Sequence, residues 1–404
     1  MCLLTLRLMV NKIRWQAHIV CLVVLGIVVF CSGCTEPTKV VEEEFQSSPQ
    51  RRPEVEVQTL EIGAVAPDFR LPGVDGKWYT LDDFADAKVL VVVFTANHCP
   101  TAQAYEERIK AVVRDYSEKG VQVVAISSNS PLALLYEECG YTDLGDTFED
   151  MKIRARDHEF NFPYLYDGDT QETALRYGPV ATPHAFVFDG ERRLRYTGRI
   201  DASEKPGTAN AEDLRAALDA VLEDREVAAP VTKAFGCSIK WSWKADWRER
   251  VDREWAQQPI TLETIDADGV RRLMENESDK LRLINVWATW CGPCVVEFPE
   301  LVVIHRMYKG RPFELVTVSS DSPEQEGEVL KFLQQHQAAV RNYLFDSEDQ
   351  YALVDAIDPD WSGALPYTVL VEPGGKVVYR HEGLIDPLVL KRTIVDHPMI
   401  GRYY

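Results

Sequence analysis

The chain has 404 residues, of which 46% are hydrophobic and 27% charged, the composition of a soluble globular protein rather than a disordered or fibrous one. This length is enough for two or three domains. Asp and Glu outnumber Lys and Arg by 64 to 44, which gives a formal charge of −20. Such a surface repels phosphate backbones, so we expect no nucleic-acid partner. Nine cysteines are too few for a disulfide-built scaffold, so their positions carry the information.

The first 34 residues predict an export signal. Residues 1–18 carry three basic residues and no acidic one, and residues 19–31 are apolar throughout. An apolar run of this length is typical of a signal peptide and is short for a membrane span of about 20 residues. Ser32 and Gly33 precede Cys34, which resembles a bacterial lipoprotein box and implies that Cys34 is lipidated. An uncleaved anchor and an ordinary signal are the alternatives, and all three export the chain to the cell envelope or periplasm.

Two stretches have the composition of linkers. Residues 35–60 are rich in Glu, Pro, Ser and Gln and lack apolar periodicity, so we predict a flexible tether between the membrane and the first domain. Residues 226–259 hold four of the nine tryptophans, interleaved with Lys and Arg. Alternating aromatics and cations can form a binding strip, but packing of the rings onto one or both domains is the simpler prediction.

The rest of the chain contains an internal repeat with an offset of 192 residues. Cys99 ends one apolar, β-rich run and Cys291 ends another, and a segment of helical character follows each. Pro131 lies 32 residues after Cys99, and Pro323 lies 32 residues after Cys291. Both copies then have a Tyr-Leu-aromatic-Asp stretch, a proline before an apolar strand and a Gly-x-Ile-Asp-like close. We therefore expect two copies of one α/β domain with a mixed sheet flanked by helices.

The sequence WATWCGPC around Cys291 resembles the active site of thioredoxin-fold proteins. Residues 260–404 are similar to the TlpA/ResA group of envelope thiol-disulfide oxidoreductases. Residues 61–225, with APDFRLPGVDGKWYTLDDF near their start, resemble the redoxin, peroxiredoxin-like group. The resemblance implies two thioredoxin-like domains that exchange or reduce disulfides of envelope proteins, with electrons from a membrane-bound donor. It implies no cofactor beyond a redox-active disulfide between Cys291 and Cys294.

Cys291 and Cys294 are the predicted redox pair of the second domain. Cys291 opens a predicted helix, whose unpaired N–H groups favour the thiolate over the thiol. Cys294 lies one turn further along and can resolve a mixed disulfide formed at Cys291. A structural zinc site is the alternative for C-x-x-C spacing, but no second cysteine or histidine pair follows in the sequence at zinc spacing.

The resemblance also implies roles for residues around this pair. Trp290 and the Leu365-Pro366 peptide, expected to be cis, would contact substrate. Thr182 and Pro183 hold the matching place in the first domain. Glu297 matches the active-site glutamate of the ResA-like group and would take the proton of Cys294, the alternative being a solvated helix residue.

Cys99 is the predicted nucleophile of the first domain. It keeps the strand-to-helix position of Cys291, but Ala102 stands where the partner cysteine would be, so a resolving thiol must come from elsewhere. Cys237 is the favoured candidate and Cys139 the alternative. The peroxiredoxin pattern places Thr three residues before the cysteine, whereas here Thr95 lies four before it. Thiol peroxidase activity, a relay to the second domain and a vestigial Cys99 all stay open.

A metal-binding or copper-delivery protein is the alternative from another class. His98, Cys99, His184 and Cys237 would supply the imidazole and thiolate ligands that suit copper, as in Sco-like thioredoxin folds. That chemistry prefers a second cysteine close to Cys99, and the sequence has none there. We therefore expect no metal.

Overall fold

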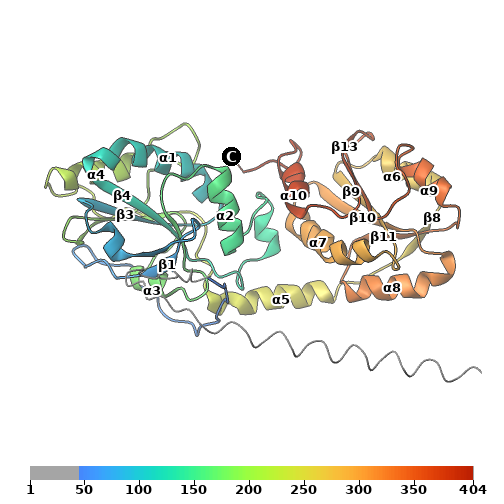
Figure 1. The fold of residues 1–404 in the computed structure, drawn as a ribbon, viewed down its shortest axis with the longest axis horizontal. Coiled ribbons are helices and arrows are strands. Elements are labelled where there is room, and N and C mark those ends of the chain that lie inside the picture. The colour runs from blue at the N-terminus through green and yellow to red at the C-terminus, as the bar shows by residue number, and fades with distance from the viewer. Residues whose placement is uncertain (1–44, 404) are drawn as a thin grey trace, which may run out of the picture. The chain divides into compact units, whose positions relative to one another are not determined.

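Two mixed sheets organise the computed structural model, which describes residues 45–403 and leaves the predicted signal and Cys34 outside (Figure 1). One sheet has the strand order β5-β4-β3-β6-β7 and the other β13-β12-β9-β10-β11-β8. In each, the central strand before the cysteine has one parallel and one antiparallel neighbour. Apart from the added edge strand β8 the two orders match, which confirms the predicted fold class of two thioredoxin-like domains.

The elements of the first domain are β1 (Arg70–Pro72), β2 (Trp78–Thr80), β3 (Val89–Thr95), α1 (Pro100–Tyr116), β4 (Val121–Ser127), η3 (Tyr136–Cys139), α2 (Phe148–Asp157), β5 (Tyr164–Tyr166), α3 (Glu172–Tyr177), β6 (His184–Phe188), β7 (Leu194–Gly198) and α4 (Glu212–Leu222). Helix α5 (Ala245–Ala256) follows. The second domain has β8 (Glu263–Ile265), α6 (Ala267–Glu275), β9 (Leu281–Trp287), α7 (Gly292–Tyr308), β10 (Phe313–Ser319), α8 (Glu326–Gln335), β11 (Arg341–Phe345), α9 (Gln350–Ile357), β12 (Tyr367–Val371), β13 (Val377–Glu382) and α10 (Pro387–Val395).

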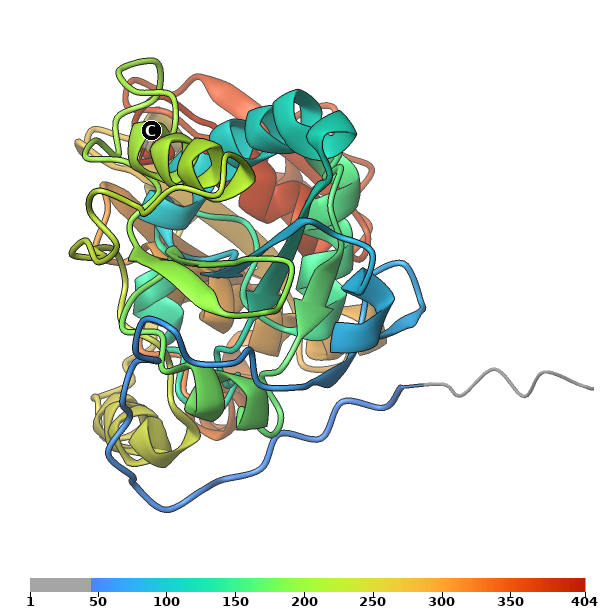
Figure 2. The same ribbon diagram turned by 90° about the vertical axis from the view of Figure 1, so that its left-hand side faces the viewer.

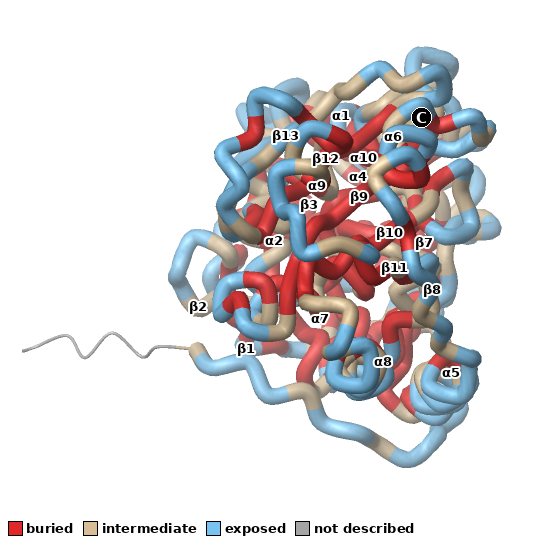
Figure 3. Tube along the Cα trace, turned by 90° about the vertical axis from the view of Figure 1, so that its right-hand side faces the viewer, coloured by how far each residue is buried: buried red, intermediate tan, exposed pale blue. Residues whose placement is uncertain are grey.

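The central strand β9 shows why these sheets are covered on both faces. All seven of its residues are buried, as expected for a strand with helices above and below (Figure 3). Leu281 and Leu283 face a core cluster with α7 and α10, whereas Ile284 and Val286 face one with α6 and α9. This alternation follows from the two-residue period of a strand. It fixes the end of β9, and with it Cys291, against a rigid core.

A short segment of the first domain, η3 and its flanks, packs on α7 of the second. Leu134 and Cys139 lie in the same buried cluster as Leu301, Ile304 and Met307. The guanidinium groups of Arg248 and Arg306 lie 4.0 and 4.7 Å from the centroid of the Tyr136 ring. Asp143 accepts hydrogen bonds from Arg392 and Arg402, and Tyr308 donates its hydroxyl to the carbonyl of Thr142 at 2.8 Å. We call residues 131–147 the docking segment.

The second half of the predicted tether lies against the first domain instead of extending freely (Figure 2). From Gln46 onward the chain belongs to one compact unit. Ser47 and Ser48 donate to the carboxylate of Asp169, and Val57 and Leu60 pack against the first core. These contacts come from hydrogen bonds and from isolated apolar side chains, which leave no hydrophobic periodicity in the sequence.

The tryptophans after the first domain pack as predicted, with one exception. Trp241 stacks on Trp243 at 4.8 Å between ring centroids and lies in the first core. Trp255, on α5, lies in a core cluster of the second domain and donates its indole N–H to the carbonyl of Gln337. Trp247 is 50% exposed. The rings therefore join α5 to both domains.

Within residues 45–403, every helix is too short or too polar to cross a membrane.

We predict that Tyr308→Phe lowers the free energy of unfolding by about 1–3 kcal/mol, because it leaves the buried carbonyl of Thr142 without its hydroxyl donor. Urea unfolding followed by tryptophan fluorescence measures this. Tyr351→Phe is the matched control, since this side chain is 84% exposed. An unchanged midpoint for Tyr308→Phe would show that this hydrogen bond contributes little to stability.

Candidate functional site

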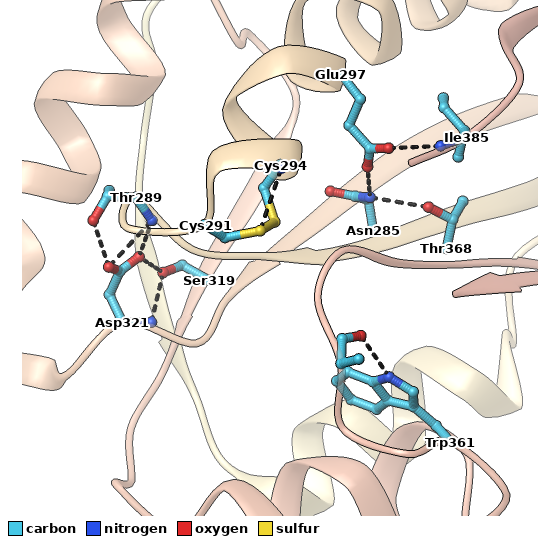
Figure 4. The surroundings of a disulfide bond; sticks show 11 residues. Asn285, Thr289, Cys291, Cys294, Glu297, Ser319, Asp321, Trp361, Thr368 and Ile385 are labelled. Atoms are coloured by element: carbon cyan, nitrogen blue, oxygen red, sulfur yellow. Dashed lines mark hydrogen bonds between the residues drawn. A yellow bond between two sulfur atoms is a disulfide. The ribbon is translucent and has the colours of Figure 1, made fainter. Parts of the chain in front are cut away.

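The two cysteines of the second domain lie where the core strand gives way to a helix (Figure 4). Cys291 is the N-cap of α7, and its sulfur accepts a hydrogen bond from the backbone N–H of Cys294 at 3.3 Å. A disulfide joins the two residues. Pro293 lies in the first turn of the helix, where its missing N–H costs nothing. Cys291 is nearly buried, whereas the neighbouring Trp290 is 67% exposed.

A buried carboxylate holds the loop before Cys291. Asp321 accepts hydrogen bonds from the backbone N–H of Thr289 at 3.0 Å and from the hydroxyls of Thr289 and Ser319 at 2.5 and 2.6 Å. Sequence reasoning did not single out this residue. The signal was available in the repeat, because LVTVSSDSP has Asp321 where VVAISSNSP has Asn129.

Glu297 is buried and is not the solvated helix residue of the alternative prediction. One carboxylate oxygen accepts from the side-chain amide of Asn285 and the other from the backbone N–H of Ile385, both at 2.9 Å. Burial raises the pKa of Glu297, although these two hydrogen bonds oppose the shift. Figure 4 shows the carboxylate directed toward Asn285 and Ile385 rather than the disulfide. The other amide atom, Oδ1 of Asn285, is buried without a hydrogen-bond partner among the described residues.

Both of the proline peptides singled out in the sequence are cis. Leu365-Pro366 leads into β12 and Thr182-Pro183 into β6, the strands that pair antiparallel with β9 and β3. Trp361, which the sequence did not indicate, donates its indole N–H to the carbonyl of Ala364 at 2.9 Å and so fixes the turn before Leu365.

Cys99 repeats the position of Cys291 in the first domain. It is the N-cap of α1 and is fully buried. Its sulfur accepts from the backbone N–H of Ala102 at 3.4 Å and lies 3.2 Å from the carbonyl oxygen of Thr182, to which the thiol donates. The helix N-terminus therefore acts on Cys99 as it does on Cys291.

The structure brings Cys237 to Cys99 and keeps Cys139 away. Cys237 packs against the small cluster of Ala96, Cys99 and Ala102. It reaches this place because Thr182 and Cys237 form an isolated antiparallel bridge. Gly236 permits the approach, since a Cβ at that position would lie 2.0 Å from the carbonyl oxygen of Thr182. Cys139 instead lies in the docking segment, in a core cluster with α7.

The surroundings of Cys99 favour its thiolate. Burial raises the pKa of this thiol, but a hydrogen bond from Cys237 and the charge of His98 outweigh it and lower the pKa to about 6. The pKa of Cys237 is raised in turn, because its S–H is the donor to Cys99. The pair therefore resembles one thiolate held by one thiol.

His98 and His184 are both engaged within the first domain. His98 Nδ1 lies 2.5 Å from Asp146 Oδ2. His184 accepts from the backbone N–H of Val180 at its Nδ1 and pairs with the Thr197 hydroxyl at its Nε2. Among residues 45–403, side chains of His, Cys, Asp and Glu form no group of three placed to bind a metal ion. Of the four donors considered for copper, Cys99 and Cys237 are in contact, but the four do not form one such group in the described part of the chain.

Curated relatives match only part of this chain. A thiol:disulfide interchange protein DsbE homologue of Paracoccus denitrificans is 30% identical over 110 residues, which cover 27% of this chain and 52% of the relative. The thiol-disulfide oxidoreductase ResA of Bacillus subtilis is 30% identical over 113 residues, 28% of this chain and 59% of ResA. The chain thus spans little more than half the length of these relatives.

One solved structure, a hypothetical protein of Sinorhizobium meliloti, is 37% identical with a TM-score of 0.41, covering 46% of this chain and 96% of its own. The AhpC/TSA family model matches residues 62–197 and again residues 258–380, together more than half of the sequence. The chain therefore belongs to the AhpC/TSA family, and it carries the family domain twice.

Proposed function

We propose that this protein is a thiol-disulfide oxidoreductase that reduces or exchanges disulfides of other proteins through Cys291 and Cys294. The observation that carries the proposal is the disulfide at the N-terminus of α7, with one cysteine capping the helix and the other one turn along. The names of the curated relatives, which are thiol:disulfide interchange proteins and thiol-disulfide oxidoreductases, support the same activity.

The exchange takes two steps. The thiolate of Cys291 attacks one sulfur of a substrate disulfide, so that a Cys291–substrate bond forms and the other substrate sulfur leaves as a thiolate. Cys294 then loses its proton and attacks the sulfur of Cys291, which closes the Cys291–Cys294 disulfide and releases the second substrate thiolate. The substrate gains two electrons and the protein loses two. A thiol donor must return the pair to the dithiol before the next cycle.

The proposed substrates are protein disulfides, and the exposed surface around the cysteines suits a protein partner. Trp290 is 67% exposed and Val296 is 71% exposed, which leaves apolar area free beside the helix N-terminus. The cis Leu365-Pro366 peptide would align a substrate strand next to Cys291. The sequence adds the proposal that the protein is exported and held in the cell envelope through Cys34 or an anchor, with a membrane-bound thiol donor.

Glu297 is the proposed acceptor of the Cys294 proton. Its pKa is raised by burial, so it exchanges protons closer to neutral pH than an exposed glutamate does. Asn285 donates from its side-chain Nδ2 to the Glu297 carboxylate, and its Oδ1 has no hydrogen-bond partner among the described residues. This free acceptor could take a hydrogen bond from the Cys294 thiol in the reduced state. We propose that these two side chains act together on that proton.

For the first domain we propose a second dithiol site, made of Cys99 and Cys237. The thiolate of Cys99 attacks a disulfide, and Cys237 resolves the product by forming a Cys99–Cys237 bond, with the same two-electron balance. Their contact in the small cluster with Ala96 and Ala102 supports this pairing. Thiol peroxidase activity would use the same two cysteines with a peroxide as the oxidant. An assay of peroxide consumption distinguishes this activity from disulfide exchange.

In a Cys99→Ser background, which removes the second proposed site, Cys291→Ser is expected to abolish reduction of insulin disulfides by the dithiothreitol-supplied protein, because it removes the remaining attacking thiolate. Cys294→Ser is expected to accumulate the mixed disulfide, which mass spectrometry detects as a covalent adduct at Cys291. Cys139→Ala is the control and keeps wild-type activity, since Cys139 lies in the docking segment. Full activity in Cys291→Ser would refute the proposed function.

Glu297→Gln is expected to slow insulin reduction about tenfold to a hundredfold, the range of a lost general base. The wild-type rate is expected to fall with decreasing pH, because Glu297 becomes protonated and can no longer accept a proton. This fall should occur at a pH above the usual range for glutamate, since burial raises the pKa of Glu297. The glutamine variant has no such step in its pH profile. Glu300→Gln, one turn further along α7, is the matched control. A pH step that persists in Glu297→Gln would assign it to another group.

Mild oxidation with diamide is expected to join Cys99 to Cys237 and to leave Cys139 reduced, because Cys237 is the cysteine among residues 45–403 that packs against Cys99, whereas Cys139 lies in another cluster. Peptide mapping by mass spectrometry, without reduction, identifies the bonds. A Cys99–Cys139 bond, or a Cys99 that stays reduced while Cys291 and Cys294 are oxidised, would contradict the second site.

A further inference from the structure

The loop before each active cysteine is held by a buried carboxylate, but the two domains take that carboxylate from different places. In the second domain it is Asp321, two residues after the end of β10, which accepts from the backbone N–H of Thr289. The repeat offset of 192 places Asn129 and Asn97 at the matching positions of the first domain. Asn129 has no charge to offer.

In the first domain the carboxylate comes from Asp146, at the end of the docking segment. One oxygen of Asp146 accepts from the backbone N–H of Asn97 at 2.8 Å and of His98 at 3.0 Å. The other accepts from the side-chain amide of Asn129 at 2.7 Å. Asn129 thus occupies the place of Asp321 and holds Asp146 against the loop. Asp146 is 1% exposed, so these contacts are out of reach of solvent.

We propose that Asp146 is the positioning residue of the Cys99 site, which fixes the loop before Cys99 and holds the His98 ring next to that loop. The inference rests on the proposed redox role of Cys99. It goes beyond that role because it assigns the reactivity of Cys99 to a residue that sequence analysis did not indicate and that lies 47 positions further along the chain.

The electrostatics agree with the geometry. Burial lowers the pKa of His98, but the charge and hydrogen bond of Asp146, whose Oδ2 lies 2.5 Å from the ring, together with the charge of Cys99, outweigh burial and raise the pKa overall. The positive His98 then favours the thiolate of Cys99. Cys237 and Lys240 also act on His98 or Cys99, and the ammonium of Lys240 is paired with Glu138. The charge of Asp146 also acts on Cys139, Asp150 and Tyr164. Asp146 alone, being negative, would disfavour the thiolate, so its effect must pass through His98.

A structural role is the competing explanation, because Asp146 belongs to a segment that docks on the second domain. Asp143 provides the matched control. It is the same residue type three positions earlier, and it holds the docking segment through Arg392 and Arg402. Asp143→Asn weakens the docking without removing a bond to the Cys99 loop, whereas Asp146→Asn removes the charge beside His98 and keeps an oxygen that can accept from Asn97.

The test is the pH profile of Cys99 alkylation by iodoacetamide in the reduced full chain, quantified by mass spectrometry on the Cys99 peptide. Its midpoint reports the thiolate fraction independently of how accessible the buried sulfur is. We expect a wild-type midpoint at about 6. We expect Asp146→Asn to react about fivefold more slowly at pH 6, because a rise of about one unit in the midpoint lowers the thiolate fraction at that pH from about one half to about one tenth. Asp143→Asn should stay within about twofold of wild type.

His98→Gln removes the other partner of the Asp146–His98 pair. It also provides a second, independent variant in case Asp146→Asn does not fold. It is expected to raise the midpoint at least as much as Asp146→Asn does, because it leaves the negative charge of Asp146 in place, and the double variant is expected to raise it no further. An ordinary thiol midpoint in wild type would refute the redox role of Cys99 itself. A low midpoint that neither Asp146→Asn nor His98→Gln changes would overturn this inference alone, and so would an equal shift in Asp143→Asn.

Discussion

The whole arrangement depends on one local constraint, the capping of a helix by a cysteine at the end of a buried strand. In both domains the sulfur accepts the backbone N–H three residues ahead, Ala102 for Cys99 and Cys294 for Cys291. A helix that starts at that residue presents its unpaired N–H groups to the sulfur, which lowers the cost of the negative charge. The core strand below keeps the cap from moving.

The two copies differ in where the partner thiol comes from. In the second domain the helix itself supplies it, because Cys294 lies one turn beyond Cys291. In the first domain Ala102 stands at that place, and Cys237 arrives from beyond the last helix of the domain through a backbone bridge to Thr182. The second thiol can therefore come from a residue nearby in the sequence or from a distant one. The distant case requires that the residue before the cis proline has a backbone free to pair with the segment that carries the thiol.

The sequence was sufficient for the repeat, the sheet type, the two cysteine positions and the cis prolines, because each leaves a local pattern or a fixed spacing. It was insufficient for Asp146 and for the packing of residues 46–60. Asp146 contacts His98, which is 48 residues away in the sequence, and Ser47 donates to Asp169, which is 122 residues away in the sequence. Contacts of this kind involve single polar side chains, which leave no periodic signal. The role predicted for Glu297 stays a prediction, and its hydrogen bond to Ile385 again depends on tertiary structure.

The docking of residues 131–147 on α7 also bears on how the molecule can be divided. Leu301, Ile304 and Met307 belong to a buried cluster that is completed by Leu134 and Cys139 of the first domain. A fragment that begins at residue 260 would carry the redox disulfide intact but would expose this apolar strip to water, and exposed strips of that kind favour aggregation. A second domain cut out at the boundary suggested by the repeat is therefore expected to be less soluble than the full chain.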